Sequence, residues 1–239
     1  MNETKMYAIT GVSGHTGAAT AEALLSTGHQ VRAVVRNAER GELWRRKRCD
    51  VAVADLGESS ALATALRGVD GAYLLSPPNF AAADFLADRQ ALLEGLVEGV
   101  KEAEIRNVVF LSSIGAQHAS GTGPIVSLHR AEQAIQGIAP SVTFLRAAYF
   151  LENWGSAIPV AREQGVLPHY GPIDVKFPQV SARDIGEAAA NALVEGERVN
   201  DYRPIFSYSS AGRWIHGFSG SPAIPTIQIA AAASAISAP

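Results

Sequence analysis

The residues with the clearest chemical meaning lie near the amino terminus, where Thr10-Gly11-Val12-Ser13-Gly14-His15-Thr16-Gly17 forms a TGxxGxxG motif. An apolar run precedes it and apolar residues at helical spacing follow it, so the motif predicts a strand, a tight turn and a helix. In such a turn the first glycine permits the bend, the second leaves room for a pyrophosphate, and the third lets helix and strand approach. The motif predicts a dinucleotide site formed by Gly11, Ser13, Gly14, His15, Thr16 and Gly17, with a ligand-free glycine turn as the alternative.

The end of the second predicted strand indicates which dinucleotide this is. An NAD site usually has Asp or Glu there to bind the ribose 2′-hydroxyl, whereas this chain has Arg36 followed by Asn37. A guanidinium suits a 2′-phosphate, so NADP(H) is favoured over NAD(H), and a solvated arginine is the alternative. Asp55, at the end of the third strand, either accepts a hydrogen bond from the adenine amino group or caps a helix.

The elements that must position these residues alternate regularly along the chain. We predict strands at 6–10, 31–35, 51–54, 71–75, 108–112 and 142–145, and helices at 16–25, 39–47, 59–66, 81–104, 128–138 and 184–195. Parallel neighbours need long crossovers, which helices provide. The sequence therefore predicts an α/β fold with a doubly wound, Rossmann-like parallel sheet.

Composition divides the chain into three regions. Residues 1–146 carry the alternating pattern and are predicted to form an NADP(H)-binding Rossmann-like domain. Residues 147–202 contain more Gly and Pro before the last helix, which predicts a small substrate-side lobe with a closing helix. Residues 203–239 contain no Asp, Glu or Lys and end in a low-complexity run, so we expect this atypical tail to pack poorly.

Composition also excludes several functions. A net charge of −3 disfavours nucleic-acid binding. The single cysteine cannot form an internal disulfide or a thiolate zinc site, and the histidines lack metal-site spacing, so no metal is expected. No run approaches the roughly 18 apolar residues of a membrane span. We therefore expect a cytoplasmic protein with no membrane partner.

Several further motifs resemble the NmrA-like group of atypical short-chain dehydrogenases/reductases. The resemblance extends from about residue 6 to 195 and rests on TGxxGxxG, Val35-Arg36-Asn37 and the segments 109–116, 128–132, 143–146, 150–153 and 180–185. That group includes NADPH:quinone reductase-like enzymes and non-catalytic redox sensors. The resemblance implies that Leu75, Ser76 and Pro77 lie beside the cofactor and that Ser112 and Ser113 border the nicotinamide.

Two departures from this pattern concern catalysis. No tyrosine is followed four residues later by a lysine, so the Tyr-x3-Lys pair of ordinary short-chain dehydrogenases is absent, and the tail after Arg203 does not resemble the family. His129 and Tyr149 are the remaining catalytic candidates. The alternative for His129 is a surface or cap interaction near Glu132 on the same predicted helix, and Tyr149 belongs either to a substrate pocket or to the core.

The sequence thus favours an NADP(H)-dependent oxidoreductase that transfers a hydride to a small quinone-like or carbonyl acceptor. We expect the acceptor pocket at residues 76–80, 112–116 and 149–154. The alternative is a non-catalytic NADP(H) sensor that acts through a protein partner. Reduction of a quinone needs only the cofactor's hydride, a correctly positioned acceptor and a proton from water. The absence of a Tyr-x3-Lys pair is therefore compatible with both the enzyme and the sensor.

Overall fold

A parallel sheet organises the molecule and confirms the predicted doubly wound α/β fold. The computed structural model describes residues 4–165, 177–196, 198–206, 209–210 and 213–214. Within these, the sheet has the order β3-β2-β1-β4-β5-β6-β9, and each neighbouring pair is parallel. Its strands are β1 (Met6–Thr10), β2 (Gln30–Val35), β3 (Asp50–Val53), β4 (Gly71–Leu75), β5 (Asn107–Ser113), β6 (Ser141–Ala147) and β9 (Asp201–Ile205). The strand order reverses between β1 and β4, which places a crevice at their carboxyl ends.

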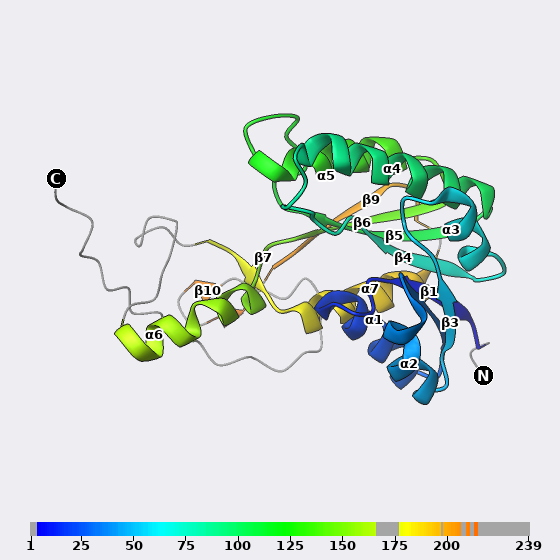
Figure 1. Ribbon diagram of the computed structural model, residues 1–239, viewed down its shortest axis with the longest axis horizontal. Helices are drawn as coiled ribbons and strands as arrows, with labels where there is room; N and C mark the ends of the chain where they lie inside the picture. The colour runs from blue at the N-terminus through cyan, green and yellow to red at the C-terminus, as the bar shows by residue number, and fades with distance from the viewer. Residues whose placement is uncertain (1–3, 166–176, 197, 207–208, 211–212, 215–239) are drawn as a thin grey trace.

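Helices cover both faces of this sheet (Figure 1). One layer contains α1 (His15–Ser26), α7 (Ala182–Glu195) and α2 (Glu42–Arg46), and the other contains α3 (Ser59–Leu66), α4 (Phe85–Glu102) and α5 (Val126–Ile135). Helix α1 packs mainly on α7, and α3 packs on α4. Because side chains alternate across each strand, the buried residues form two clusters, one against α1 and α7 and one against α3, α4 and α5.

Capping residues explain where the helix boundaries differ from the predicted ones. Helix α4 begins at Phe85 rather than at residue 81, because the Asp84 side chain accepts a hydrogen bond from the Ala87 N–H at 3.0 Å. The predicted helix at 39–47 is a 3₁₀ turn, η1 (Ala38–Gly41), followed by the short α2. A Cβ on Gly41 would lie 2.4 Å from Val51, so the chain passes close to β3 at this point.

Strand β9 was missed from the sequence. The tail boundary predicted at residue 203 falls inside this strand, which pairs with β6 along its length. Its five residues include Pro204, which is acceptable in an edge strand but obscures the strand pattern in the sequence. Ile205 is buried, and the ring of Tyr202 stacks on Phe144 with 4.8 Å between centroids. Beyond Phe206, the structure describes only β10 (Ser209–Ser210) and β11 (Arg213–Trp214), an antiparallel pair; the other residues of the predicted tail lie outside the described residues.

The predicted substrate-side segment contains short elements next to the carboxyl ends of the strands. These are β7 (Tyr149–Phe150), η3 (Leu151–Ser156), α6 (Ile158–Gln164) and β8 (Gln179–Val180), where β7 and β8 pair in parallel. Figure 1 shows them extending to the left of the sheet, below α5. Residues 166–176 of this segment lie outside the described part of the chain.

Candidate functional site

The glycine turn has the geometry that its motif predicts. Gly11 has a φ of +66°, which favours glycine, and a Cβ there would lie 2.6 Å from Leu75. A Cβ on Gly17 would lie 2.4 Å from the Gly11 carbonyl oxygen, so α1 approaches the turn too closely for any larger residue. At Gly14, by contrast, a Cβ would meet only the Gly11 oxygen, at 3.4 Å. Gly14 therefore borders open space.

The first turn of α1 can hold an anion. Gly14 is its N-cap residue and contributes no side-chain hydrogen bond, and the turn contains no acidic residue. The first N–H groups of a helix have no acceptor within the helix, and the helix dipole makes this end positive. The uncapped N–H groups and the dipole together favour a negatively charged ligand group at this point.

A cleft of about 860 Å³ opens above this turn at the carboxyl ends of β1, β2, β3 and β4. Among the predicted site residues, those that line it are Gly11, Ser13, Gly14, Thr16, Arg36, Asp55, Leu75 and Pro77. Six predicted site residues do not line this cleft: His15, Gly17, Asn37, Ser76, Ser112 and Ser113. Of these, His15 lines a second hollow of about 920 Å³ between α1, α2 and α7. Six of these eight lining residues, Gly11, Ser13, Gly14, Thr16, Arg36 and Asp55, lie on the β1, β2 and β3 side of the cleft.

Two arginines that follow β2 in the sequence line the cleft. Arg36 and Arg40 both line it, both are exposed, and neither forms an ion pair with any residue that the structure describes. Asn37 has a supporting role, because its side-chain oxygen accepts a hydrogen bond from the Arg40 N–H at 3.1 Å and caps η1. Sequence reasoning missed Arg40; the available signal was a second basic residue four positions after Arg36.

Asp55 is not a helix cap. Helix α3 begins at Ser59, and Asp55 Oδ1 instead accepts a hydrogen bond from the Gly57 N–H at 2.9 Å. This turn holds the exposed carboxylate at the edge of the cleft. The helix-cap alternative is therefore wrong, and the contact of Asp55 with adenine stays a prediction.

The segment after β4 is fastened to α4 and forms another wall of the cleft. Arg89, whose side chain is 8% exposed, donates a hydrogen bond to the Pro77 carbonyl and pairs with Asp88. Asn79 Nδ2 donates to Asp88 Oδ1 at 3.1 Å. The hydrogen bonds from Arg89 hold the pKa of the Asp88 carboxyl below its usual value. Asp88 and Arg89, which sequence reasoning missed, both line the cleft.

The carboxyl end of β5 differs from the expectation. The Ser112 hydroxyl is buried and donates to Glu132 Oε1 of α5 at 2.6 Å, so it does not point toward the cleft. Glu132 also accepts from both Nε and Nη2 of Arg146, at 2.9 and 2.5 Å. Ser113 lies on the opposite face of the strand, and its hydroxyl donates to the Ile114 carbonyl. Neither serine lines the cleft, and the contact of Ser113 with a ligand stays a prediction.

The two catalytic candidates have different surroundings. His129 is half-buried and does not pair with Glu132; its Nδ1 bonds to the Ala116 carbonyl at 2.8 Å. A carbonyl only accepts, so Nδ1 carries the proton and donates it. Tyr149 is 41% exposed and packs edge-on against Trp154 and Phe177, so it is not a core residue. Neither His129 nor Tyr149 lines the cleft.

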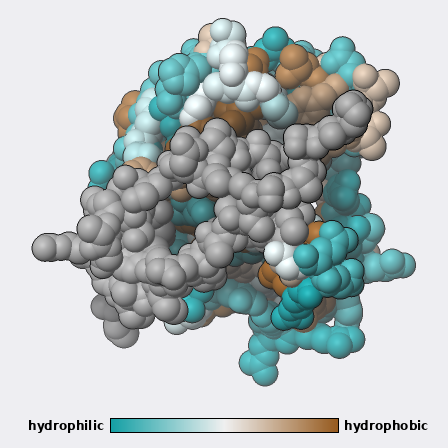
Figure 2. All heavy atoms as spheres, turned by 90° about the vertical axis from the view of Figure 1, so that its left-hand side faces the viewer, coloured by the Kyte–Doolittle hydropathy of each residue, from teal (hydrophilic) through white to brown (hydrophobic). Residues whose placement is uncertain are grey.

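The face that carries these carboxyl ends is the left-hand side of Figure 1 and is turned to the viewer in Figure 2. There, hydrophobic residues reach the surface between hydrophilic ones.

In the described part of the chain, no group of three His, Cys, Asp or Glu side chains is arranged to hold a metal ion. No helix among the described residues is long and apolar enough to cross a membrane.

Comparison with known proteins gives matches over most of the chain. The family model of the NmrA-like family matches residues 3–205. The NAD(P)H azoreductase of Xenophilus azovorans is 25% identical over 201 residues, which cover 84% of this chain and 67% of that protein. Quinone oxidoreductase 2 of Escherichia coli is 27% identical over 192 residues, covering 80% of this chain and 64% of that protein. The chain thus spans roughly two thirds of the length of these relatives.

Solved structures have the same fold. The NADPH complex of an NADPH-dependent quinone oxidoreductase from Escherichia coli superimposes with a TM-score of 0.71 at 26% identity, covering 83% of this chain and 68% of that one. A triphenylmethane reductase from Citrobacter gives a TM-score of 0.73 at 22% identity, covering 84% and 69%. The second likeness concerns the fold alone.

Proposed function

The chain belongs to the NmrA-like family, and from this premise we propose that it is an NADP(H)-dependent oxidoreductase that reduces a small quinone-like or carbonyl compound. The observation that carries the proposal is the cleft, because it joins the uncapped first turn of α1 to Arg36 and Arg40, two arginines without an ion pair among the described residues. These are complementary to the diphosphate and the 2′-phosphate of one NADP(H) molecule. The similar azo and quinone reductases support this reading.

The lining residues fit this cofactor. The N–H groups of the first turn of α1 would hold the diphosphate, and Gly14 leaves the space that it needs. Arg36 and Arg40 would bind the 2′-phosphate, and no acidic residue stands at the end of β2 to favour NAD(H) instead. Asp55 would accept a hydrogen bond from the adenine amino group. Pro77, held by Arg89, would bound the cleft on the α4 side.

The chemistry needs few protein groups. When bound, the cofactor supplies a hydride. Reduction of a quinone-like acceptor then needs one proton in addition, which we assign to water, because the sequence has no Tyr-x3-Lys pair. His129 does not line the cleft and its Nδ1 bonds to the Ala116 carbonyl, so we assign it no proton-transfer step. The residues of the chain thus chiefly bind and orient.

The sensor alternative has no support from the comparisons. The similar curated proteins named above are reductases. No protein partner is proposed for the same reason, and a small-molecule substrate is the partner that the family relatives favour.

Calorimetry with NADPH and NADH tests the cofactor assignment. We expect the wild type to bind NADPH more tightly, and Arg36→Gln and Arg40→Gln each to lose about 1.5–3 kcal/mol of NADPH binding while NADH binding stays unchanged. Arg67→Gln is the matched control, since this exposed arginine follows α3, pairs with Glu102 and does not line the cleft. Equal affinities of the wild type for both cofactors would refute the NADP(H) assignment.

Turnover is the second arm of the same experiment. NADPH oxidation is followed with a panel of quinones and carbonyl compounds, and we expect oxidation with at least one quinone. NADPH binding without oxidation of any panel member would contradict the enzymatic part of the proposal and leave the binding part standing.

A further inference from the structure

One arginine in the wall of the cleft is buried. The side chain of Arg89, on α4, is 8% exposed, yet this residue lines the cleft. Its Nε donates to Asp88 Oδ2 at 3.0 Å, and its Nη1 donates to the carbonyl of Pro77, which follows β4. A buried charge is costly unless it is paired and hydrogen-bonded. Arg89 meets this condition by joining α4 to the segment after β4.

Two further contacts fasten this segment to the first turns of α4. Asn79 Nδ2 donates to Asp88 Oδ1 at 3.1 Å. The ring of Phe80 stacks on that of Phe85, the first residue of α4, with 5.4 Å between centroids and 9° between the ring planes. Residues 77–80 are all exposed, so contacts with α4 rather than burial hold them in place.

Two prolines of the segment line the cleft. Pro77 and Pro78 are both exposed there. Proline has a fixed φ and no backbone N–H, so these residues offer a ligand their rings and no hydrogen-bond donor. We call them the Pro77–Pro78 wall. The position of this wall depends on Arg89, because Arg89 binds the Pro77 carbonyl.

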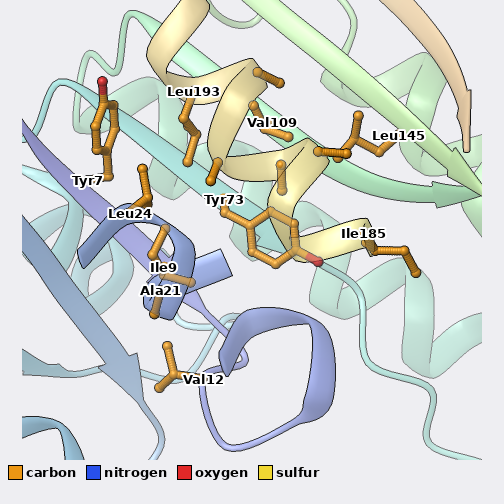
Figure 3. Packing of buried hydrophobic residues seen from close by; sticks show 14 of the residues in the cluster. Tyr7, Ile9, Val12, Ala21, Leu24, Tyr73, Val109, Leu145, Ile185 and Leu193 are labelled. Carbon is orange, nitrogen blue, oxygen red and sulfur yellow. The ribbon is translucent and has the colours of Figure 1, made fainter. Parts of the chain in front are cut away.

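The core fixes the wall relative to the glycine turn. Ile9 on β1 pairs with Tyr73 on β4, and Figure 3 shows both side chains among the buried residues. The Thr10 hydroxyl donates to the Tyr73 carbonyl at 3.0 Å. The turn after β1 and the segment after β4 therefore begin from two strands that are held together.

The wall and the arginine that is expected to bind the 2′-phosphate lie on opposite sides of this turn. In the sheet order β3-β2-β1-β4, Arg36 follows β2 and Asp55 follows β3, whereas Pro77 follows β4. The diphosphate connects the two halves of a dinucleotide. A molecule with its diphosphate on the turn after β1 and its 2′-phosphate on Arg36 therefore directs its nicotinamide half toward β4.

We propose that Arg89 is a positioning residue for the nicotinamide half of the cofactor, because it holds the Pro77–Pro78 wall at the carboxyl end of β4. This inference rests on the proposed NADP(H) site. Arg89 acts through the wall and not by direct contact with the cofactor. Binding of the adenosine half depends instead on Arg36 and Arg40, which follow β2, and does not require Arg89.

The test compares two probes by calorimetry on the full chain. NADPH contains both halves, whereas adenosine 2′,5′-bisphosphate contains the adenosine and the 2′-phosphate but no nicotinamide half. We expect Arg89→Met to raise the Kd for NADPH about three- to ten-fold, which is the effect of one hydrogen bond, and to leave the Kd for the bisphosphate unchanged. Arg36→Gln should weaken both probes. A general structural defect would also act on both.

Arg32→Met is the matched control. Arg32 is another largely buried arginine that pairs with an aspartate and binds backbone carbonyls: its Nε lies 2.6 Å from Asp50 Oδ2, and its Nη1 donates to the Ala65 and Arg67 carbonyls at 3.2 and 2.8 Å. Arg32 does not line the cleft. Its replacement should lower the Tm, as that of Arg89 does, but leave both Kd values unchanged.

Pro78→Gly tests the wall without a change in the core. It removes an exposed ring and frees the backbone at this position, while Arg89 keeps its partners. We expect the same pattern as for Arg89→Met, with weaker binding of NADPH and unchanged binding of the bisphosphate. This variant decides the question alone if Arg89→Met does not fold.

Several results would overturn this inference. An unchanged Kd for NADPH in Arg89→Met, or equal losses for both probes, would show that Arg89 does not position the nicotinamide half. An unchanged Kd for NADPH in Pro78→Gly would show that the wall does not contact the cofactor. If the wild type binds neither probe, the proposed function fails; if it binds both and Arg89→Met behaves as Arg32→Met does, only this inference fails.

Discussion

Single residues of the glycine turn separate folding from binding. Gly17→Ala places a methyl group 2.4 Å from a backbone oxygen that cannot rotate away, so α1 must shift, and we expect a loss of about 1–3 kcal/mol in unfolding free energy. Gly14→Val projects into open space from an extended backbone, so the fold should persist while NADPH binding is lost. Thermal unfolding and calorimetry on both variants check this. A stable Gly17→Ala, or normal NADPH binding by Gly14→Val, would contradict it.

Among single residues, the sequence predicted those cleft residues whose position follows directly from the local backbone. The glycine spacing located the turn, and Arg36 was found because it follows a strand directly. Residues that act through long-range contacts could not be found this way. Arg89 lines the cleft because α4 packs beside the segment that follows β4, where Arg89 donates to the Pro77 carbonyl. Ser112 does not line the cleft because its hydroxyl donates to Glu132 of α5.

At the scale of elements, one buried carboxylate joins a helix to two strands. Glu132 of α5 is 1% exposed and accepts hydrogen bonds from Ser112 on β5 and Arg146 on β6. The Arg146 guanidinium in turn lies 4.4 Å from the ring centroid of Tyr202 on β9. Removing one member of a buried pair leaves the other uncompensated, which costs about 3–5 kcal/mol. We expect a loss of this size for Glu132→Leu by chemical denaturation.

The controls separate the ion pair from general effects. Glu98→Gln changes an exposed carboxylate on α4 and should alter stability by less than about 0.5 kcal/mol. The double variant Glu132→Leu with Arg146→Met removes both charges and should be more stable than the sum of the single losses predicts. Additive losses would mean that the two side chains do not depend on each other. Helical spacing in the sequence places Glu132 near His129, but it does not show that the partner of Glu132 is Arg146 on β6.

For the molecule as a whole, periodic segments were predictable and the last strand was not. Strands β1 and β4 and helix α3 have the predicted bounds, because each combines apolar periodicity with clear breaks. Strand β9 follows α7 in the sequence, and it is a strand because it pairs with β6, a contact that the local sequence does not show. Composition describes residues 203–239 as one region, although the sheet includes the first three of them.

Strand β9 forms one edge of the sheet, so its contribution to stability can be measured by removing it. We compare a chain that ends at Asn200 with one that ends at Phe206, so that both lack the same residues beyond Phe206. The shorter chain loses the burial of Ile205, the stacking of Tyr202 on Phe144 and the pairing of β9 with β6. Ile205 and the ring stacking together stabilise the fold by about 3 kcal/mol, which in a domain of this size corresponds to roughly 6–12 °C in Tm. Calorimetric melting measures the difference. Equal Tm values would show that the sheet is complete at β6, and the edge strand would then be an accessory to the fold rather than part of it.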